Sequence, residues 1–156
     1  MIPFAGNLVL AGVWAAALGE FSLTNLVAGF GLGFAILAIA PQQSSERYSR
    51  KVLRSVEFTA FFIGQLVIAS FRVTADIVTP AQRARPGIVA VPLDAETDIE
   101  ITMLANVISL TPGSISLDVS ADRRTLFVHV MFLDDVTTCR REIKDGFERR
   151  ILELLR

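Results

Sequence analysis

The sequence has almost no charge in its first 45 residues. Of its 156 residues, 15 are Lys or Arg and 16 are Asp or Glu, but Glu20 is the only charged residue before Glu46. Every Lys and Arg lies at Arg47 or later. The net charge of −1 therefore sums two unlike regions and gives no information about partners.

Cysteine and histidine are nearly absent as well. Cys139 is the only cysteine, which excludes a disulfide framework and a Cys cluster for zinc. With one His, and without G-x-S-x-G, H-E-x-x-H or a phosphate loop, few catalytic constellations are possible. We therefore expect no enzyme activity, no cofactor and no resident metal, and we expect Cys139 to fill an apolar helix face.

Two long apolar runs occupy the uncharged region. Ile2 to Leu18 and Phe21 to Ala40 carry no charge, apart from the intervening turn at Glu20. At about 1.5 Å per residue, they give roughly 25 and 30 Å of helix, which can reach across a hydrocarbon core, the first only just. Pro41 ends the second run. The pattern predicts a transmembrane helical hairpin over residues 1–41.

A secretory signal peptide is the competing interpretation, since Ala38-Ile39-Ala40 resembles a cleavage site. The apolar region is much longer than the usual ~7–15 residues, however, and no basic segment precedes it. The hairpin is therefore the better interpretation.

The second apolar run contains the pattern G-x-x-x-G at Gly29 and Gly33. In lipid, this spacing lets another helix approach closely, and the partner is either the first helix or another chain. The hairpin has no ionisable group at membrane depth. Since carriers of protons or metal cations need such groups, we expect that the hairpin alone is not an ion path.

A basic joint follows the hairpin within residues 42–79. Arg47, Arg50, Lys51 and Arg54 are spaced to share one helical face, which suits anionic lipid headgroups or simply sets the topology. Basic residues favour the cytoplasmic side. Phe58 to Phe71, fourteen residues, would span only about 21 Å. We expect an amphipathic, shallow or partly inserted helix there, although a third crossing is possible.

Residues 80–156 have the pattern of a small α+β domain. A short strand near Ile88–Leu93 precedes a capping box, Thr97 with Glu100, which predicts a helix to about Leu110. Two alternating segments then predict paired strands, and Asp134 or Asp135 caps a last amphipathic helix. The expected order is β-α-β-β-α. Asp94, Glu96, Asp98 and Glu100 resemble a metal cluster, but acids are also favoured near a helix N-terminus.

Thr111-Pro112-Gly113 predicts a sharp corner between the helix and the next strand. Pro112 ends the helix, and Gly113 supplies the positive φ of a type II turn. An alternative is that the amides of this turn face an anion. The strand after it is expected to carry Ile115, Leu117 and Val119 on one face.

The strand Thr125 to Leu133 is apolar on both faces. If the two helices cover one face, Phe127, His129 and Met131 must meet something else, and an exposed apolar patch usually marks an interface. His129 is either a structural residue or a pH-responsive interface contact.

These residues also resemble a known family. The segments RPGIVAVPLD, DIEITMLANVISLTPGSISLDVS and LFVHVMFLDD, after an apolar hairpin and a basic joint, resemble the E subunits of the Mrp-type multisubunit sodium/proton antiporters of bacteria. The likeness covers nearly the whole chain. The family motif falls on these positions: Pro86, Gly87, Leu104, Ala105, Asn106, Thr111, Pro112, Gly113 and His129.

The resemblance implies a noncatalytic accessory subunit in the bacterial plasma membrane, multi-pass and with its C-terminal domain in the cytoplasm. Its partners would be the other membrane subunits, with anionic headgroups at the basic joint and no nucleic acid. The alternative is a stand-alone membrane-tethered domain that senses a small anion or metal at the Thr111–Ser114 corner or at the Asp94–Glu100 acids.

Overall fold

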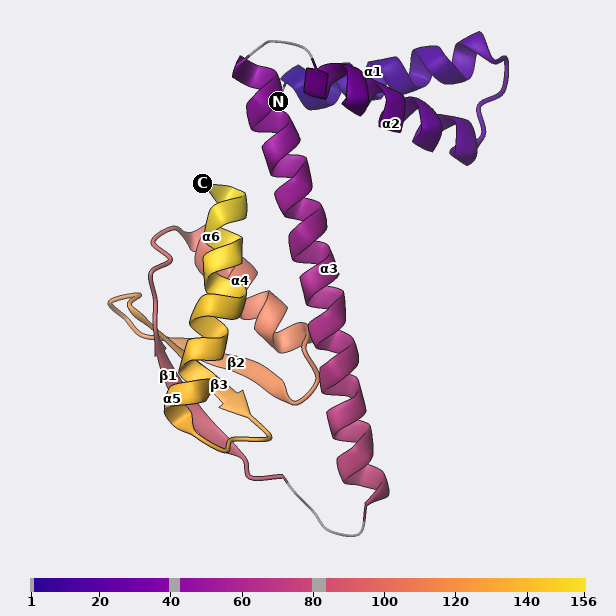
Figure 1. Cartoon of the computed structure of the whole chain (residues 1–156). Helices are drawn as coiled ribbons and strands as arrows, with labels where there is room; N and C mark the ends of the chain where they lie inside the picture. The colour runs from indigo at the N-terminus through magenta and orange to yellow at the C-terminus, as the bar shows by residue number, and fades with distance from the viewer. Residues whose placement is uncertain (1, 40–42, 80–83) are drawn as a thin grey trace. The chain divides into compact units, whose positions relative to one another are not determined.

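The computed structural model describes residues 2–39, 43–79 and 84–156 (Figure 1). Its chain divides into two compact units, Met1–Leu53 and Arg54–Arg156.

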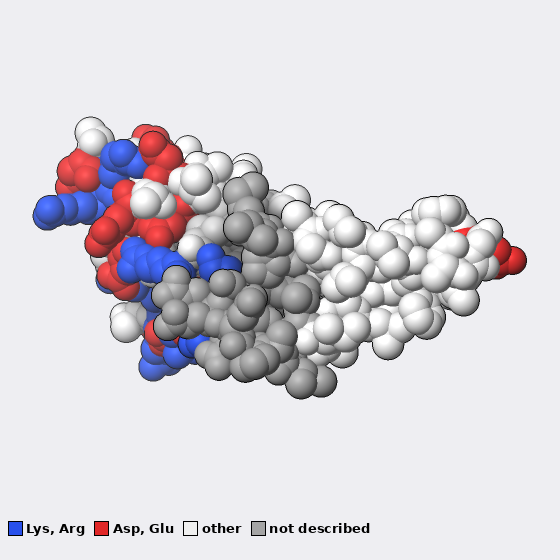
Figure 2. Space-filling model, turned by 90° about the horizontal axis from the view of Figure 1, so that it is seen from above, with Lys and Arg blue, Asp and Glu red and all other residues white. Residues whose placement is uncertain are grey.

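The first unit is a helical hairpin. Helix α1 (Ile2–Ala17) and helix α2 (Leu23–Ile39) are joined by a short turn. Ser22 begins α2, because its Oγ accepts a hydrogen bond from the Asn25 N–H at 3.2 Å. The described surface of the hairpin is uncharged except at one end, as the red atoms in Figure 2 show, and Glu20 lies in the turn. The predicted pair of apolar helices is therefore present.

The two helices pack through the G-x-x-x-G glycines. A Cβ on Gly29 would lie 2.8 Å from Trp14 Cβ and 3.0 Å from Ala11 Cα, and a Cβ on Gly33 would overlap Asn7 Oδ1. Small residues therefore let the backbones approach. Of the two partners that the sequence left open, the first helix occupies this surface, so Gly29 and Gly33 are not exposed to another chain.

Helix α3 (Gln43–Val78) runs unbroken for 36 residues, about 54 Å. The basic joint and the apolar stretch Phe58–Phe71 thus form one helix, because no proline interrupts them and the single glycine, Gly64, costs only about 1 kcal/mol. Among the described residues, Arg50–Val78 is the one helical segment long and apolar enough to cross a membrane, while Phe4–Ala17 and Leu23–Ile36 are shorter apolar helices.

The second unit adds an α+β domain to α3 from Arg54 onward. Its elements follow the predicted β-α-β-β-α order, which is confirmed, although the last helix has three parts. They are β1 (Gly87–Pro92), α4 (Asp98–Leu110), β2 (Ser114–Val119), β3 (Thr125–Val130), α5 (Val136–Arg141), the π-helix η1 (Glu142–Glu148) and α6 (Arg149–Leu155).

The sheet is antiparallel with strand order β1-β3-β2 (Figure 1). Val89 pairs with Val128 and Val91 with Leu126, and all four side chains are fully buried. They form the core with the inner face of α4, whose predicted core residues are confirmed. The buried residues of that face include Ile101, Leu104, Val107 and Ile108.

Two strand predictions were wrong in detail. Strand β3 ends at Val130 rather than Leu133, and Met131 donates its N–H to the Gly113 carbonyl at 2.7 Å instead of continuing the ladder. In β2, a register shift between Ser116 and Asp118 separates Val119 from Ile115. A bulge of this kind turns the following side chains to the other face, so Ile115 and Val119 do not share one.

Candidate functional site

The carboxylates near the start of α4 are used by the fold. Glu100 Oε2 accepts hydrogen bonds from the backbone N–H of Glu96 and Thr97, at 2.9 and 3.1 Å, which completes the predicted capping box. Glu100 Oε1 accepts from Arg156 Nε at 2.9 Å. The Arg156 guanidinium and then the two amides lower the pKa of Glu100 to about 2, against the opposing effect of burial.

The neighbouring acids are also paired. Lys144 Nζ lies 2.8 Å from Asp94 Oδ2 and 2.9 Å from Glu148 Oε2, and Asp98 pairs with Arg123. Burial opposes the charge of Lys144, but the hydrogen bonds to Asp94 and Glu148 outweigh it and raise its pKa. Across residues 2–39, 43–79 and 84–156, no group of three or more His, Cys, Asp or Glu is placed to hold a metal.

The Thr-Pro-Gly corner has the predicted type II geometry. Gly113 has a φ of +87°, and the Ser114 N–H donates to the Thr111 carbonyl at 3.2 Å. The hydroxyls of Thr111 and Ser114 donate to carbonyls at the end of α4, at 3.0 and 2.8 Å. These donors are already used within the corner, so the geometry does not favour an anion site there.

The other motif residues also occupy structural positions. Leu104 is fully buried, and the Ala105 carbonyl accepts from Ser116 Oγ at 3.0 Å. Gly87 begins β1 directly under the Leu133 side chain, where a Cβ would overlap it. Pro86 and Asn106 are exposed. The motif therefore describes how helix, corner and sheet fit together.

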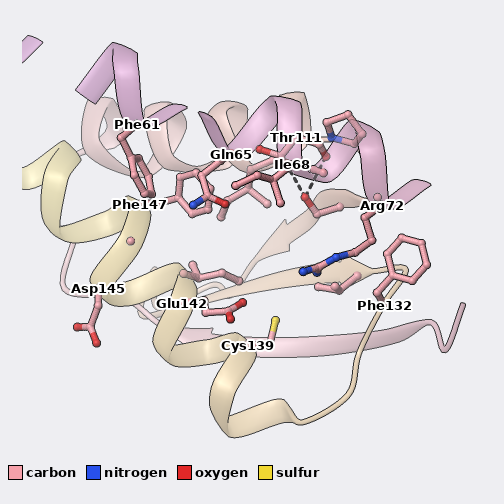
Figure 3. Close-up of a pocket in the computed structure, with 18 residues that line it drawn as sticks. Phe61, Gln65, Ile68, Arg72, Thr111, Phe132, Cys139, Glu142, Asp145 and Phe147 are labelled. Carbon is pink, nitrogen blue, oxygen red and sulfur yellow. Dashed lines mark hydrogen bonds between the residues drawn. The ribbon is translucent and has the colours of Figure 1, made fainter. Parts of the chain in front are cut away.

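A cavity of about 390 Å³ lies between α3, the corner and the last helix (Figure 3). Most of its lining is apolar, and its polar side chains come mainly from α3 and from the α5–η1 segment. The polar and charged members include Gln65, Arg72, Thr111, Ser114, Glu142 and Asp145. One positively charged and two negatively charged side chains line the cavity, so its charge does not indicate a class of ligand.

Cys139 lines this cavity but is not poised for chemistry. Burial, and then the nearby Glu142 carboxylate, raise the pKa of its thiol above the ordinary value. A raised pKa disfavours the thiolate, which is the reactive form. Cys139 therefore serves as apolar filling in a helix face, half-buried against the core.

One face of α3 is anchored to the domain. Phe58 is a member of the buried core, and the Phe61 ring meets the Phe147 ring edge-on with centroids 5.5 Å apart. The Arg150 guanidinium lies 4.1 Å from the Phe61 centroid. Arg54 donates to the Glu153 carbonyl at 2.7 Å. These contacts span about two turns of α3.

The second face of the sheet is open. His129 pairs with Ile88 on one side and Ile115 on the other, and the two isoleucines are 62% and 50% exposed. Phe127 and His129 are half-buried on this face. We call Ile88, Ile115, Leu117, Phe127 and His129 the open sheet face, at whose border the exposed Asp118 lies opposite Phe127. Met131, also predicted for this patch, lies beyond β3 next to the corner.

Two features were missed from the sequence. Asn7 lies in the middle of the first apolar run and is fully buried against Gly33. A lone amide in an uncharged run was the available signal. The π-helix at Glu142–Glu148 was not predicted either, because π-helices are rare and appear mostly as single turns inside α-helices.

Three residues of the basic joint are exposed, namely Arg50, Lys51 and Arg54. Arg54 also donates to the Glu153 carbonyl of the domain. The side chain of Arg47 lies outside the described residues. The contact of these four residues with lipid headgroups stays a prediction.

Comparison with known proteins identifies the family. The family model described as Na+/H+ ion antiporter subunit matches residues 7–154. The chain belongs to this antiporter subunit family. The E subunit of the Na+/H+ antiporter of Alkalihalophilus pseudofirmus is 32% identical over 149 residues, which is 95% of this chain and 94% of the relative. The E subunit of the Bacillus subtilis antiporter is 31% identical over 96% of both chains.

One solved structure agrees with this assignment and supports the resemblance seen in the sequence. A chain in the Mrp complex from Dietzia has a TM-score of 0.52 and 29% identity, covering 67% of this chain and 97% of that one. A chain of an archaeal membrane-bound sulfane sulfur reductase has a TM-score of 0.57 over 96% of both, at 22% identity, and shows the fold alone.

Proposed function

We propose that this member of the family is a noncatalytic accessory subunit of a multisubunit Na+/H+ antiporter in a bacterial plasma membrane. It holds neighbouring subunits in place and has no cation site of its own. The family match and the antiporter relatives support membership in an antiporter complex. The residues of this chain support the accessory role.

The observation that carries the proposal is the chemistry of the hairpin. Glu20 is its only charged residue and lies in the turn, and the buried polar side chain, Asn7, is packed against Gly33. A path for cations or protons needs ionisable groups at membrane depth. The hairpin instead offers small residues and an exposed apolar surface for lateral packing, so other subunits carry the exchange.

The proposed topology places α1 and α2 in the membrane and the α+β domain in the cytoplasm. The basic residues at the start of α3 favour the cytoplasmic side. Since α3 packs on the domain through Phe58 and Phe61, lipid cannot surround it unless the charged domain also enters the bilayer, which is costly. The domain therefore stays on the side of the basic joint. Arg50 and Lys51 are the residues of the joint proposed to meet anionic headgroups.

The open sheet face is the proposed contact with another subunit. Its isoleucines are at least half exposed, and the described residues leave this side of the sheet uncovered. Apolar faces of this kind usually mark protein interfaces. His129, at the centre of this face, contributes a polar group. The pH dependence of assembly tests its part in the contact.

Purification from the native membrane tests the proposed function. A tagged chain solubilised in mild detergent should recover large membrane subunits in fixed stoichiometry. Vesicles that contain this chain alone should show no sodium flux above protein-free vesicles. Recovery of a monomer, or sodium flux through the chain alone, would contradict the proposal.

A further inference from the structure

Helix α3 has a second face, which points away from the domain and is entirely uncharged. At 100° per residue, residues spaced by three, four and seven positions share one side of a helix. From Val56 to Val78, such a stripe contains only apolar or small residues with one threonine. We call it the outer stripe, and its members are Val56, Ala60, Ile63, Gly64, Val67, Phe71, Thr74 and Val78.

The outer stripe is exposed along its whole length. Val56, Ile63 and Phe71 are 62%, 55% and 72% exposed, and Val78 at the far end is equally open. The stripe covers about 33 Å of helix. The charged residues of this part of α3 all fall outside it, namely Arg54, Glu57, Arg72 and Asp76. A soluble surface helix would have the opposite pattern, with charge on the exposed side.

The two faces of α3 together restrict its orientation. One face holds Phe58, Phe61 and Arg54 against the domain, so α3 cannot stand in the hydrocarbon with lipid on all sides. The opposite face is too apolar to be left in water over this length. Both requirements are met if α3 lies parallel to the membrane surface, with the outer stripe toward lipid and the domain toward water.

The short connection between α2 and α3 also indicates that the outer stripe faces lipid. Only residues 40–42 separate α2 from α3, so the first residue of α3 lies within about 15 Å of the last residue of α2. On the proposed function, on which this inference rests, α2 ends at the cytoplasmic membrane surface. The exposed Arg50 and Lys51 then follow at the level of anionic headgroups.

We infer that the outer stripe of α3 is a lipid-binding surface that lies in the headgroup region of the bilayer. Its apolar side chains enter the boundary between headgroups and acyl chains, which for helices of this kind is about 5–10 Å deep. The domain is then held by α3 at a fixed height and orientation under the membrane. The open sheet face is thereby presented to neighbouring subunits.

Tryptophan fluorescence gives a direct test, because Trp14 is the only tryptophan. Wild-type chain is reconstituted into phosphatidylethanolamine and phosphatidylglycerol vesicles containing lipids brominated either near the headgroup end or near the middle of the acyl chain. In a Trp14→Phe background, single tryptophans are introduced by Val67→Trp and Phe71→Trp on the outer stripe. Ile99→Trp, at an exposed isoleucine of the domain, is the matched control.

The inference predicts that both outer-stripe tryptophans are quenched more by shallow than by deep bromines, while the tryptophan of Ile99→Trp is quenched by neither. Stronger quenching of Val67→Trp by the deep bromines would show a third membrane crossing and overturn the inference. If neither outer-stripe tryptophan is quenched while Trp14 of wild type is quenched, the stripe contacts another protein instead of lipid. That result would also overturn the inference. If Trp14 itself is not quenched, the proposed membrane hairpin fails independently.

Discussion

At the scale of single residues, side chains that resemble a ligand site stabilise the fold instead. Glu100 closes the N-terminus of α4 and accepts from Arg156, 56 residues later in the chain. Lys144 joins Asp94 to Glu148 in the same way. The last helix is thus bonded to the loop before α4 by charged groups that a sequence pattern would assign to a metal.

The first prediction concerns the pH dependence of stability. The pKa of Glu100 falls from 4.5 to about 2 in the folded protein. A depressed carboxyl pKa stabilises the fold above the unfolded value, and this contribution is lost as pH falls from about 4.5 toward 2. Thermal unfolding midpoints across that range should therefore fall less steeply for Glu100→Gln than for wild type.

Arg156→Gln should reduce the same slope, because it removes the principal cause of the low pKa. Arg149→Gln, at an exposed arginine of α6, is the control and should leave the wild-type slope unchanged. Equal slopes in all four proteins would refute the role given to Glu100.

The second prediction concerns the corner. Gly113→Ala should lower the free energy of unfolding by about 1–2 kcal/mol, because Gly113 has a φ of +87° and L-residues are strained there. The space itself is adequate, since the nearest atom to a new Cβ, Val73 Cγ2, is 3.5 Å away. Urea unfolding measures the change. Gly64→Ala in α3, where a Cβ meets nothing within 4 Å, should be neutral or stabilising.

At the scale of elements, the sequence correctly predicted the features that depend on residues close together in the chain. The capping box at Thr97, the turn at Gly113 and the N-cap at Asp135 all depend on residues a few positions apart, and all are present. The β-α-β-β-α order follows from them. Local patterns of this kind place the elements of the domain correctly.

The elements that long-range contacts shape were not predictable. In β2, Ser116 faces α4 and bonds to the Ala105 carbonyl, whereas Ile115 is exposed, the reverse of a simple apolar-in strand. The bulge after Ser116 belongs to the pairing of β2 with β3, and the π-helix at Glu142–Glu148 interrupts the last helix; neither was predicted. Phe58 and Phe61 of α3 also pack on the domain, a contact that the sequence did not indicate.

The third prediction concerns the packing of α1 on α2. Gly29→Ala should separate the helices, because the new Cβ would lie 2.8 Å from Trp14 Cβ and 3.0 Å from backbone atoms of Ala11. Overpacking of this kind costs about 1–3 kcal/mol. Trp14 fluorescence during unfolding in mixed micelles reports the change. Gly31→Ala is the matched control, since its Cβ meets nothing within 4 Å, and an equal loss there would contradict the packing.

At the scale of the whole molecule, each unit offers an apolar surface, and Glu20 in the turn is the only charged residue of the hairpin. The hairpin exposes uncharged helices, and the domain exposes the open sheet face. The antiporter relatives match along nearly the full chain, so both surfaces lie within the part shared with antiporter subunits. The proposed role in holding subunits together uses both.

The fourth prediction tests the open sheet face. Ile115→Asp places a charge on this face beside His129 and should reduce the recovery of partner subunits with the tagged chain by about tenfold or more, since an unpaired interface charge costs several kcal/mol. Ile99→Asp, at a similarly exposed isoleucine on α4, should leave recovery unchanged. Circular dichroism checks that both variants fold. Equal recovery from both would assign the interface elsewhere.

The most direct test is sodium/proton exchange per assembled complex. The acids among residues 1–79 are Glu20, Glu46, Glu57 and Asp76. Neutralising all four to Gln or Asn should leave the exchange rate per assembled complex in vesicles within about twofold of wild type, because a subunit without an ion relay contributes no essential carboxylate. A fall of about tenfold or more in that rate, in complexes whose subunit composition is unchanged, would place an ion-carrying group in this chain and contradict the account.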